Sequence, residues 1–176
     1  GLENARGMAE RGFTVVLICR TQEKGEATRQ KLAADIPDAD LHVLACDMAS
    51  QQQIRACAAA FLQQFDRLDV LINNAGVFLP DYQETEDGYE ATFAINHLAY
   101  FLLTHLLLDR IKQTPNARIV NVASDAHVPA KIDMNNLEST SKYNGYFRYG
   151  ESKLCNVLFT YELARRLGDT SITCNA

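Results

Sequence analysis

The chain has 176 residues and a formal net charge of −5, from 17 Lys and Arg against 22 Asp and Glu. With a pI near 5.3, it lacks the excess of cations that binding a polymer of phosphates requires, which argues against nucleic acid as a partner. Its longest apolar runs, such as residues 14–19, are shorter than the ~20 residues of a membrane helix, so we expect no membrane span.

The cysteines and histidines also exclude some classes of protein. The five cysteines are odd in number and include no C-x-x-C pair, in a chain large enough to build a core without disulfides. We therefore expect reduced thiols and an intracellular, cytoplasmic protein. The four histidines are scattered and form no H-x-x-x-H pair, so the sequence predicts no metal site.

Short apolar runs rich in β-branched residues predict strands buried on both faces, separated by segments of helical length. In chain order, the predicted strands are residues 13–19, 41–46, 70–72 and 119–122, followed by a strand that begins near residue 172. Strands that alternate with helices imply right-handed crossovers and a parallel sheet covered on both faces. The predicted fold class is therefore α/β, an open, doubly wound sheet in three α/β/α layers.

Capping residues and apolar spacing predict the helices. Residues 1–11 read as a short helix, and Ser50-x-x-Gln53 is a capping box that begins another. Thr85 is predicted to cap a long helix that runs to about residue 114, and a last helix spans residues 146–167. The predicted apolar stripe of the long helix consists of Leu98, Phe101, Leu102, His105 and Leu106.

Ligands of open α/β sheets bind beyond the carboxyl ends of the strands, and small or polar residues stand at those places in this sequence. Arg20, Asp47 and Ser124 each follow a predicted strand, and so does the run Asn73-Asn74-Ala75-Gly76. Each also has a purely structural interpretation, as a turn, a helix cap or a strand terminator.

The last predicted helix carries a candidate acid–base pair. Tyr149 and Lys153 are four residues apart and therefore share one helix face. A phenol is a weak acid and base at neutral pH, and a nearby cation favours its phenolate form. The irregular stretch 125–145 has the length of a lid, and Tyr82, Tyr143 and Tyr146 are candidates for lining a substrate pocket.

In this order, Asn73-Asn74-Ala75-Gly76, Ser124 and Tyr149-x-x-x-Lys153 resemble the short-chain dehydrogenase/reductase family. Residues 1–7 resemble the family's first helix, with Gly1 as the last glycine of its phosphate loop. Asn96 matches the family's active-site Asn, and Asp47 matches its adenine-contacting Asp. The resemblance covers essentially the whole chain and implies a Rossmann-like sheet.

One branch of that family is the most similar. The gap from Ser124 to Tyr149 is 149 − 124 = 25 residues, and it separates the runs Asn121-Val122-Ala123-Ser124-x-Ala126-His127 and Tyr149-x-x-Ser152-Lys153-Leu154. Both features are similar to the retinol dehydrogenase-like and WW-domain-oxidoreductase-like branch. Ala123 departs from that pattern, because relatives commonly carry a second Ser there.

The resemblance implies an oxidoreductase that transfers a hydride between a nicotinamide cofactor and a carbonyl or alcohol of an apolar substrate. Tyr149 is implied as the general acid or base, Lys153 as its cation, and Ser124 as a donor to the substrate oxygen. Asn96 would hold a water that connects Lys153 to solvent. The implied cofactor-binding residues are Gly1, Arg20, Asp47, Asn73, Ala75, Gly76, Tyr149 and Lys153.

Arg20 indicates which cofactor to expect. NAD sites usually place an acidic residue at this strand end, whereas an Arg accommodates the 2′-phosphate of NADP. Arg20 has no acidic residue beside it in the sequence, which favours NADP(H) over NAD(H). As structural alternatives, Arg20 simply ends its strand in solvent and Asn73 ties neighbouring strands together.

The sequence leaves two other functions open. One is a non-catalytic nucleotide-binding or protein-interacting relative of the same fold, which would have no chemical need for all of Asn96, Ser124, Tyr149 and Lys153. The other is a sugar-nucleotide epimerase or dehydratase, which shares the Tyr-x-x-x-Lys pair. The Asn-Asn-Ala-Gly run and the helical Asn96 fit the dehydrogenase branch better.

The positions of the motifs, compared with their order in the family that the chain resembles, indicate how much of a complete domain the chain contains. We expect residues 1–176 to be a single NAD(P)-binding domain truncated at both ends, without the first strand and the C-terminal substrate region. Such a chain alone is expected to be poorly stable, because its buried-type strands would form open edges. For the full-length protein, the sequence does not decide whether it forms a homo-oligomer or whether it has a membrane anchor outside these residues.

Overall fold

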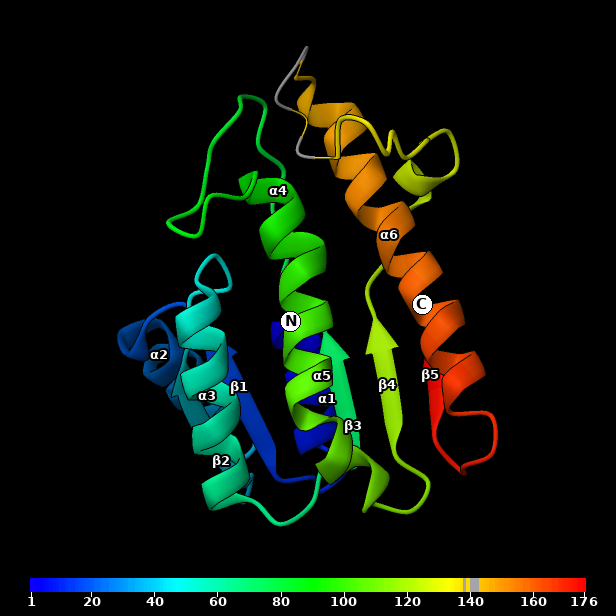
Figure 1. Cartoon of the computed structure of the whole chain (residues 1–176). Helices are drawn as coiled ribbons and strands as arrows, with labels where there is room; N and C mark the ends of the chain where they lie inside the picture. The colour runs from blue at the N-terminus through cyan, green and yellow to red at the C-terminus, as the bar shows by residue number, and fades with distance from the viewer. Residues whose placement is uncertain (138, 140–142) are drawn as a thin grey trace.

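The computed structural model describes residues 1–137, 139 and 143–176, drawn in Figure 1. Its strands are β1 (Val15–Cys19), β2 (Leu41–Ala45), β3 (Val70–Asn73), β4 (Arg118–Asn121) and β5 (Thr173–Asn175). Its helices are α1 (Leu2–Ala9), α2 (Gln22–Asp35), α3 (Gln51–Gln64), α4 (Ala91–Phe93), the π-helical η1 (Ala94–Leu98), α5 (Ala99–Lys112), the 3-10 turn η2 (Asp125–His127) and α6 (Gly145–Arg166).

All of the strand pairs in the described part of the chain are parallel, which confirms the α/β class. Strand β1 pairs with β2, and β4 lies between β3 and β5. The strands therefore form two parallel sheets rather than the one continuous sheet expected, because none of the described residues pairs β1 with β3. Each predicted strand is present, with its ends shifted by one or two residues.

Alternating residues of β1 face two different helical layers, as expected for a strand buried on both sides. Val16 and Ile18 pack on the large core, which contains residues of α3, α5 and α6. Leu17 instead packs with Ala5 of α1 and Leu32 of α2. In the view of Figure 1, the arrows of β3 and β4 lie between α5 and α6. The predicted three-layer arrangement is therefore present.

The capping box at the start of α3 is formed only in part. Ser50 Oγ accepts a hydrogen bond from the backbone N–H of Gln53 at 3.4 Å, as predicted. The Gln53 side chain does not return to Ser50; its Oε1 accepts from the backbone N–H of Asp47 at 2.9 Å. This bond fixes the segment between β2 and α3, where Asp47 lies.

The long central helix begins later than predicted, so the expected cap at Thr85 is wrong. Gly88 has φ of +81° and turns the chain back, so that Glu84 bridges Glu90 in an antiparallel pair. The helical run starts at Ala91, and the Glu90 carboxylate accepts two of its backbone N–H groups at 2.8 Å. A carboxylate here also suits the positive end of the helix dipole.

The predicted apolar stripe of this helix is right only in part, because Leu102 and Leu106 are partly buried against the core whereas Phe101 and His105 face outward. Phe101 is 52% exposed, and His105 is exposed as well. The buried residues of α5 are Ala99, Tyr100, Leu103, Thr104, Leu107 and Ile111. Because α5 is apolar on most of its surface, the sequence pattern alone did not determine which side packs against the sheet.

The helical run Ala91–Lys112 is long and apolar enough to cross a membrane, judged by length and composition only. Buried helices at the centre of a globular fold pass the same test. In this fold, 56% of the apolar window is buried, largely against α3 and α6. The structure thus places this run as a core helix.

A first prediction concerns Gly145, where α6 begins against residues 79–80. A Cβ on Gly145 would overlap the Leu79 carbonyl oxygen and lie 2.9 Å from Pro80 Cα. Because backbone atoms cannot rotate away, Gly145→Ala should lower the free energy of unfolding by about 1–3 kcal/mol in urea denaturation. Gly7→Ala is the control, since its Cβ would meet only the flexible end of Arg11, at 3.4 Å. Equal unfolding free energies for the two variants would contradict this packing.

Candidate active site

The side chain of Asn73 ties the carboxyl ends of β3 and β4 together. It is 4% exposed, and its Nδ2 donates to Asn121 Oδ1 at 2.8 Å and to Thr104 Oγ1 at 3.0 Å. Asn121 in turn donates to Thr160 Oγ1 on α6 at 2.9 Å. The side chain of Asn73 therefore has the structural role given as its alternative, which is to tie neighbouring strands together.

Asn96 lies on η1, is fully buried and holds the loop that follows β3. Its Oδ1 accepts from the Val77 N–H at 2.8 Å, and its Nδ2 donates to the Val77 carbonyl at 2.9 Å and to Ser152 Oγ at 3.1 Å. The backbone oxygen of Asn96 accepts from Asn156 Nδ2 at 2.9 Å. Both N–H donors of the side-chain amide are thus used within the protein, by Val77 and Ser152.

Lys153 places a buried ammonium at this end of the sheet. It is 3% exposed, and its Nζ donates to the Val122 carbonyl at 2.9 Å. That single bond leaves two of its three N–H donors without a partner among the described residues. Burial lowers the pKa of Lys153, because the charged form loses hydration.

Gly76 keeps space open beside this ammonium. A Cβ at position 76 would lie 3.6 Å from Lys153 Nζ and 3.4 Å from Asn96 Oδ1. The Asn-Asn-Ala-Gly run therefore leaves room where the Lys153 donors are still available. The Ala75 carbonyl is held from the other side, since it accepts from Tyr100 Oη at 2.8 Å.

Tyr149 and Lys153 share a face of α6, as their spacing predicted. Lys153 Nζ lies 5.7 Å from the centre of the Tyr149 ring. The backbone oxygen of Tyr149 accepts from Ser152 Oγ at 2.7 Å, which links this turn to Asn96. The phenol ring meets Phe78 edge to face, with centroids 6.0 Å apart.

Ser124 lies at the start of η2, on a segment held against the helix turn that carries Tyr149. Its Oγ accepts from the Ala126 N–H at 3.3 Å, which leaves its own O–H free to donate elsewhere. Close packing with α6 is possible because residue 150 is glycine: a Cβ there would lie 2.6 Å from the Ala126 carbonyl oxygen.

Arg20 and Asp47 lie together at the ends of β1 and β2. The Arg20 side chain is 58% exposed, and its Nε is 3.8 Å from Asp47 Oδ2. The sequence showed no acidic residue beside Arg20, so this proximity was missed. Farther along the same edge, the Gly1 amino group donates to Asn74 Oδ1 at 3.2 Å.

Several residues that hold the site have a role that was not predicted from the sequence. Ser152 and Asn156 are three and seven residues after Tyr149, so helical spacing was a usable signal for both. Tyr100 is four residues after Asn96, and burial raises its pKa, so it remains a neutral donor to Ala75. Phe78, 53% exposed beside Tyr149, had no signal in the sequence.

Among the remaining tyrosines and histidines, His127 contacts this cluster, because its Nδ1 lies 2.6 Å from the Ser124 backbone oxygen. Tyr146 is 58% exposed, and Tyr143 contacts Glu90. His97 bonds to Asn156 at 3.0 Å, and burial lowers the pKa of its imidazole. Within residues 1–137, 139 and 143–176, no group of three or more His, Cys, Asp or Glu is arranged to hold a metal ion.

The fold and the site together define an open α/β protein whose candidate ligand crevice lies at the carboxyl ends of its strands. A model of the short chain dehydrogenase family matches residues 1–176. The chain belongs to that family. The predicted family is thereby confirmed.

Curated relatives confirm the retinol dehydrogenase-like branch. The chain is 44% identical to retinol dehydrogenase 12 of Mus musculus, over 100% of this chain and 56% of that protein. It is also 44% identical to retinol dehydrogenase 11 of Homo sapiens, over 98% of this chain and 54% of that protein. The chain thus spans about half the length of the curated relatives it matches.

Solved structures share the fold. An uncharacterized protein from Mycobacterium paratuberculosis is 37% identical, with a TM-score of 0.85 over 98% of this chain and 60% of that chain. A variant of actinorhodin polyketide ketoreductase with NADPH is 27% identical, with a TM-score of 0.73 over 99% of this chain and 63% of that chain.

A second prediction follows from the burial of Lys153. Its pKa in the folded state lies below the ordinary value of 10.5, so the unfolded chain binds more protons between those two values. The free energy of unfolding should therefore rise with pH across that window relative to Lys153→Met, measured by urea denaturation between about pH 7 and pH 11. Lys112→Met, which removes an exposed lysine, is the control and should run parallel to the wild type. A parallel profile for Lys153→Met as well would contradict the lowered pKa.

Proposed function

We propose that this chain is the nucleotide-binding and catalytic part of an oxidoreductase that acts on a carbonyl or alcohol of an apolar substrate, with NADP(H) as cofactor. We propose further that residues 1–176 form one domain. The observation that carries the proposal is the buried Lys153 ammonium, which has free donors beside the space left by Gly76 and lies on the same helix face as Tyr149.

The residues present fit a dinucleotide. A ribose hydroxyl suits the two unused N–H donors of Lys153, and Gly76 leaves room for the sugar to approach. Ala75, Asp47 and Gly1 would contribute along the same sheet edge, whereas Asn73 would act only by fixing the strand ends. When bound, the cofactor supplies or accepts the hydride, and the protein supplies position and charge.

Tyr149 is proposed to deliver a proton to the substrate oxygen during reduction and to remove it during alcohol oxidation. The fixed charge of Lys153 favours the phenolate that reduction leaves behind. The free O–H of Ser124 would donate to the same substrate oxygen and stabilise its developing negative charge. Asn96 would hold the loop that lies beside these groups.

An apolar substrate is supported by Phe78, whose exposed ring flanks Tyr149. The curated relatives are named for retinol, an alcohol with an apolar body. The comparisons give no support to a sugar-nucleotide epimerase or to a non-catalytic relative.

A preference for NADP(H) is supported by Arg20 at the end of β1, because a guanidinium suits the 2′-phosphate. Asp47, 3.8 Å from Arg20, opposes this preference in part, since it competes with the phosphate for the same cation. The Arg20 side chain is more than half exposed and is free to turn toward a phosphate. The ketoreductase with a similar fold was solved with NADPH.

A third prediction addresses the acid–base role. Tyr149→Phe removes the phenolic proton and keeps the ring, so kcat should fall by about 10²–10⁴-fold with an apolar aldehyde while NADPH still binds. The measurement is steady-state NADPH oxidation together with a fluorescence titration of NADPH. Tyr161→Phe, which alters a 70% exposed tyrosine of the same helix, should leave kcat unchanged. Wild-type turnover in Tyr149→Phe would refute the role.

A fourth prediction addresses the cofactor. Arg20→Leu should raise the Kd for NADPH by about tenfold, the effect of losing one charge-assisted bond, and leave the Kd for NADH unchanged. Titration of both cofactors measures this difference. Arg165→Leu, on the exposed face of α6, is the control and should change neither value. Tighter binding of NADH than of NADPH by the unmodified protein would reject the assignment.

A further inference from the structure

A buried ion pair lies beside the candidate site and takes no part in the proposed proton transfer. Glu90 is 0% exposed, Arg148 is 2% exposed, and Arg148 Nε donates to Glu90 Oε2 at 2.7 Å. The same carboxylate accepts the backbone N–H groups of Thr92 and Phe93, both at 2.8 Å. Glu90 therefore also caps the helical run that leads to Asn96.

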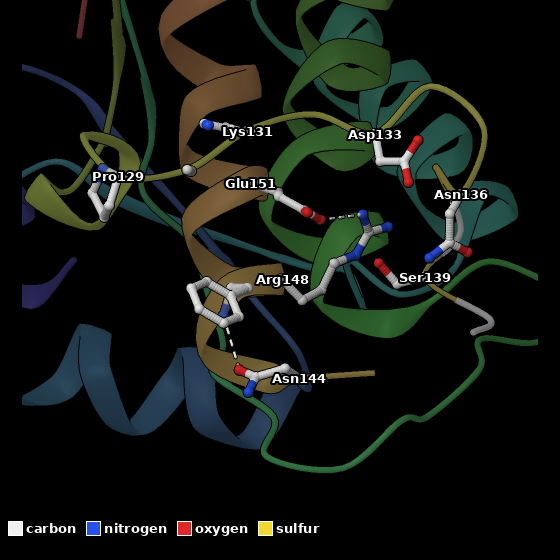
Figure 2. A pocket seen from close by; sticks show the side chains of 10 residues that line it. Pro129, Lys131, Asp133, Asn136, Ser139, Asn144, Arg148 and Glu151 are labelled. Carbon is white, nitrogen blue, oxygen red and sulfur yellow. Dashed lines mark hydrogen bonds and ion pairs between the residues drawn. The ribbon is translucent and has the colours of Figure 1, made fainter. Parts of the chain in front are cut away.

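On the other side of the pair, Arg148 directly precedes Tyr149 on α6. Its guanidinium carbon lies 4.3 Å from the centre of the Phe93 ring, and its Nη1 is 3.2 Å from Glu151 Oε2. Figure 2 shows the Arg148 side chain extending from α6 toward Glu151. The guanidinium is thus fixed on its face and on two of its nitrogens, which sets its orientation as well as its position.

The third nitrogen of Arg148 is not engaged. Among the described residues, Nη2 has no hydrogen-bond partner, and Arg148 borders a cavity of about 340 Å³. In Figure 2 the side chains of Asp133, Asn136 and Ser139 stand around that side of the guanidinium. A buried donor without a protein partner disfavours folding. The hydrogen bonding of its own N–H groups therefore does not explain why an arginine is buried at this position.

The same carboxylate is linked to the segment after β3 through Tyr143. Tyr143 Oη lies 3.2 Å from Glu90 Oε1 and donates to the Leu79 carbonyl at 3.0 Å. Leu79 follows Phe78, whose ring packs on Tyr149. Glu90 thus joins three segments: the loop that carries Phe78, the helical run that carries Asn96, and the start of α6 that carries Tyr149.

A buried ion pair is weak evidence for a gain in the stability of the fold, because well-packed apolar residues often stabilise a fold as much. A planar guanidinium held by several partners does fix the geometry of the segments that it joins. We propose that the Glu90–Arg148 pair is a positioning device for the reaction: it holds the first turns of α6, and with them Tyr149, against the segments that carry Phe78 and Asn96. This inference rests on the proposed acid–base role of Tyr149.

The test compares Arg148→Met, Arg148→Lys and Glu90→Gln in NADPH-dependent reduction of an apolar aldehyde. Arg148→Met should lower kcat per NADPH-binding site by at least about tenfold while the Kd for NADPH changes by less than about twofold. Arg148→Lys keeps the charge but loses the planar fork, so its kcat should lie between those of the wild type and Arg148→Met. The double variant Glu90→Gln/Arg148→Met should be no slower than the slower single variant, since both remove one interaction.

The control is Arg165→Met, which breaks an exposed ion pair with Glu162 on the same helix and should leave kcat unchanged. Counting active molecules by NADPH binding separates a lowered kcat from a loss of folded protein. If the pair variants melt at lower temperature but keep the wild-type kcat per binding site, the pair is only structural and the inference is overturned. If Arg148→Met does not fold, the same comparison is made with Arg148→Lys, and an unchanged kcat overturns the inference.

The failure of this inference is distinguishable from failure of the proposed function. Wild-type turnover in Tyr149→Phe would remove the acid–base role and, with it, the reason for positioning Tyr149. An inactive Tyr149→Phe together with fully active pair variants would leave the function in place and reject the positioning role alone.

Discussion

The side-chain amide of Asn96 joins the parts of the candidate site that come from different regions of the sequence. It binds both backbone groups of Val77 and the hydroxyl of Ser152, whose own proton goes to the Tyr149 carbonyl. The loop after β3 is thereby held at a fixed distance from the face of α6. Without that amide, the loop would lose the two bonds that hold Val77, the residue that follows the space at Gly76 beside the Lys153 ammonium.

A second set of amide and hydroxyl groups fixes the platform beneath. The Asn73–Asn121 bond joins two strand ends at matching register, and Asn121 continues to Thr160 on α6. Buried polar networks with satisfied hydrogen bonds select one arrangement, since any shift leaves polar groups unpaired in a medium of low dielectric. The apolar layers therefore build the fold, and these amides set where the crevice and the α6 face meet.

Much of the fold followed from local sequence patterns. The strands were predictable because burial on both faces leaves continuous β-branched runs, and the pair Tyr149 and Lys153 was predictable because helical spacing is local. The capping of the long helix by Glu90 rather than Thr85 depends on a turn at Gly88, and the buried face of α5 depends on tertiary contacts. Neither is encoded in a short window of sequence.

The sequence predicted which residues belong to the candidate site, but it did not predict which of them are in contact. The partner of Asn96 is 19 positions away and is a backbone group, which leaves no signature in residue types. The approach of Asp47 to Arg20 joins the ends of two strands, and the Glu90–Arg148 pair spans 58 positions. Such contacts arise only when the layers assemble, so residue spacing could not indicate them.

The most direct test of the central claim is transfer of the hydride itself. The protein is mixed with NADPH that carries deuterium at the transferable position and with an apolar aldehyde, and the alcohol is analysed by mass spectrometry. The site described above predicts an alcohol that carries one deuterium on its carbinol carbon. An unlabelled alcohol, or no alcohol although NADPH is bound, would contradict the claim that this site performs hydride transfer.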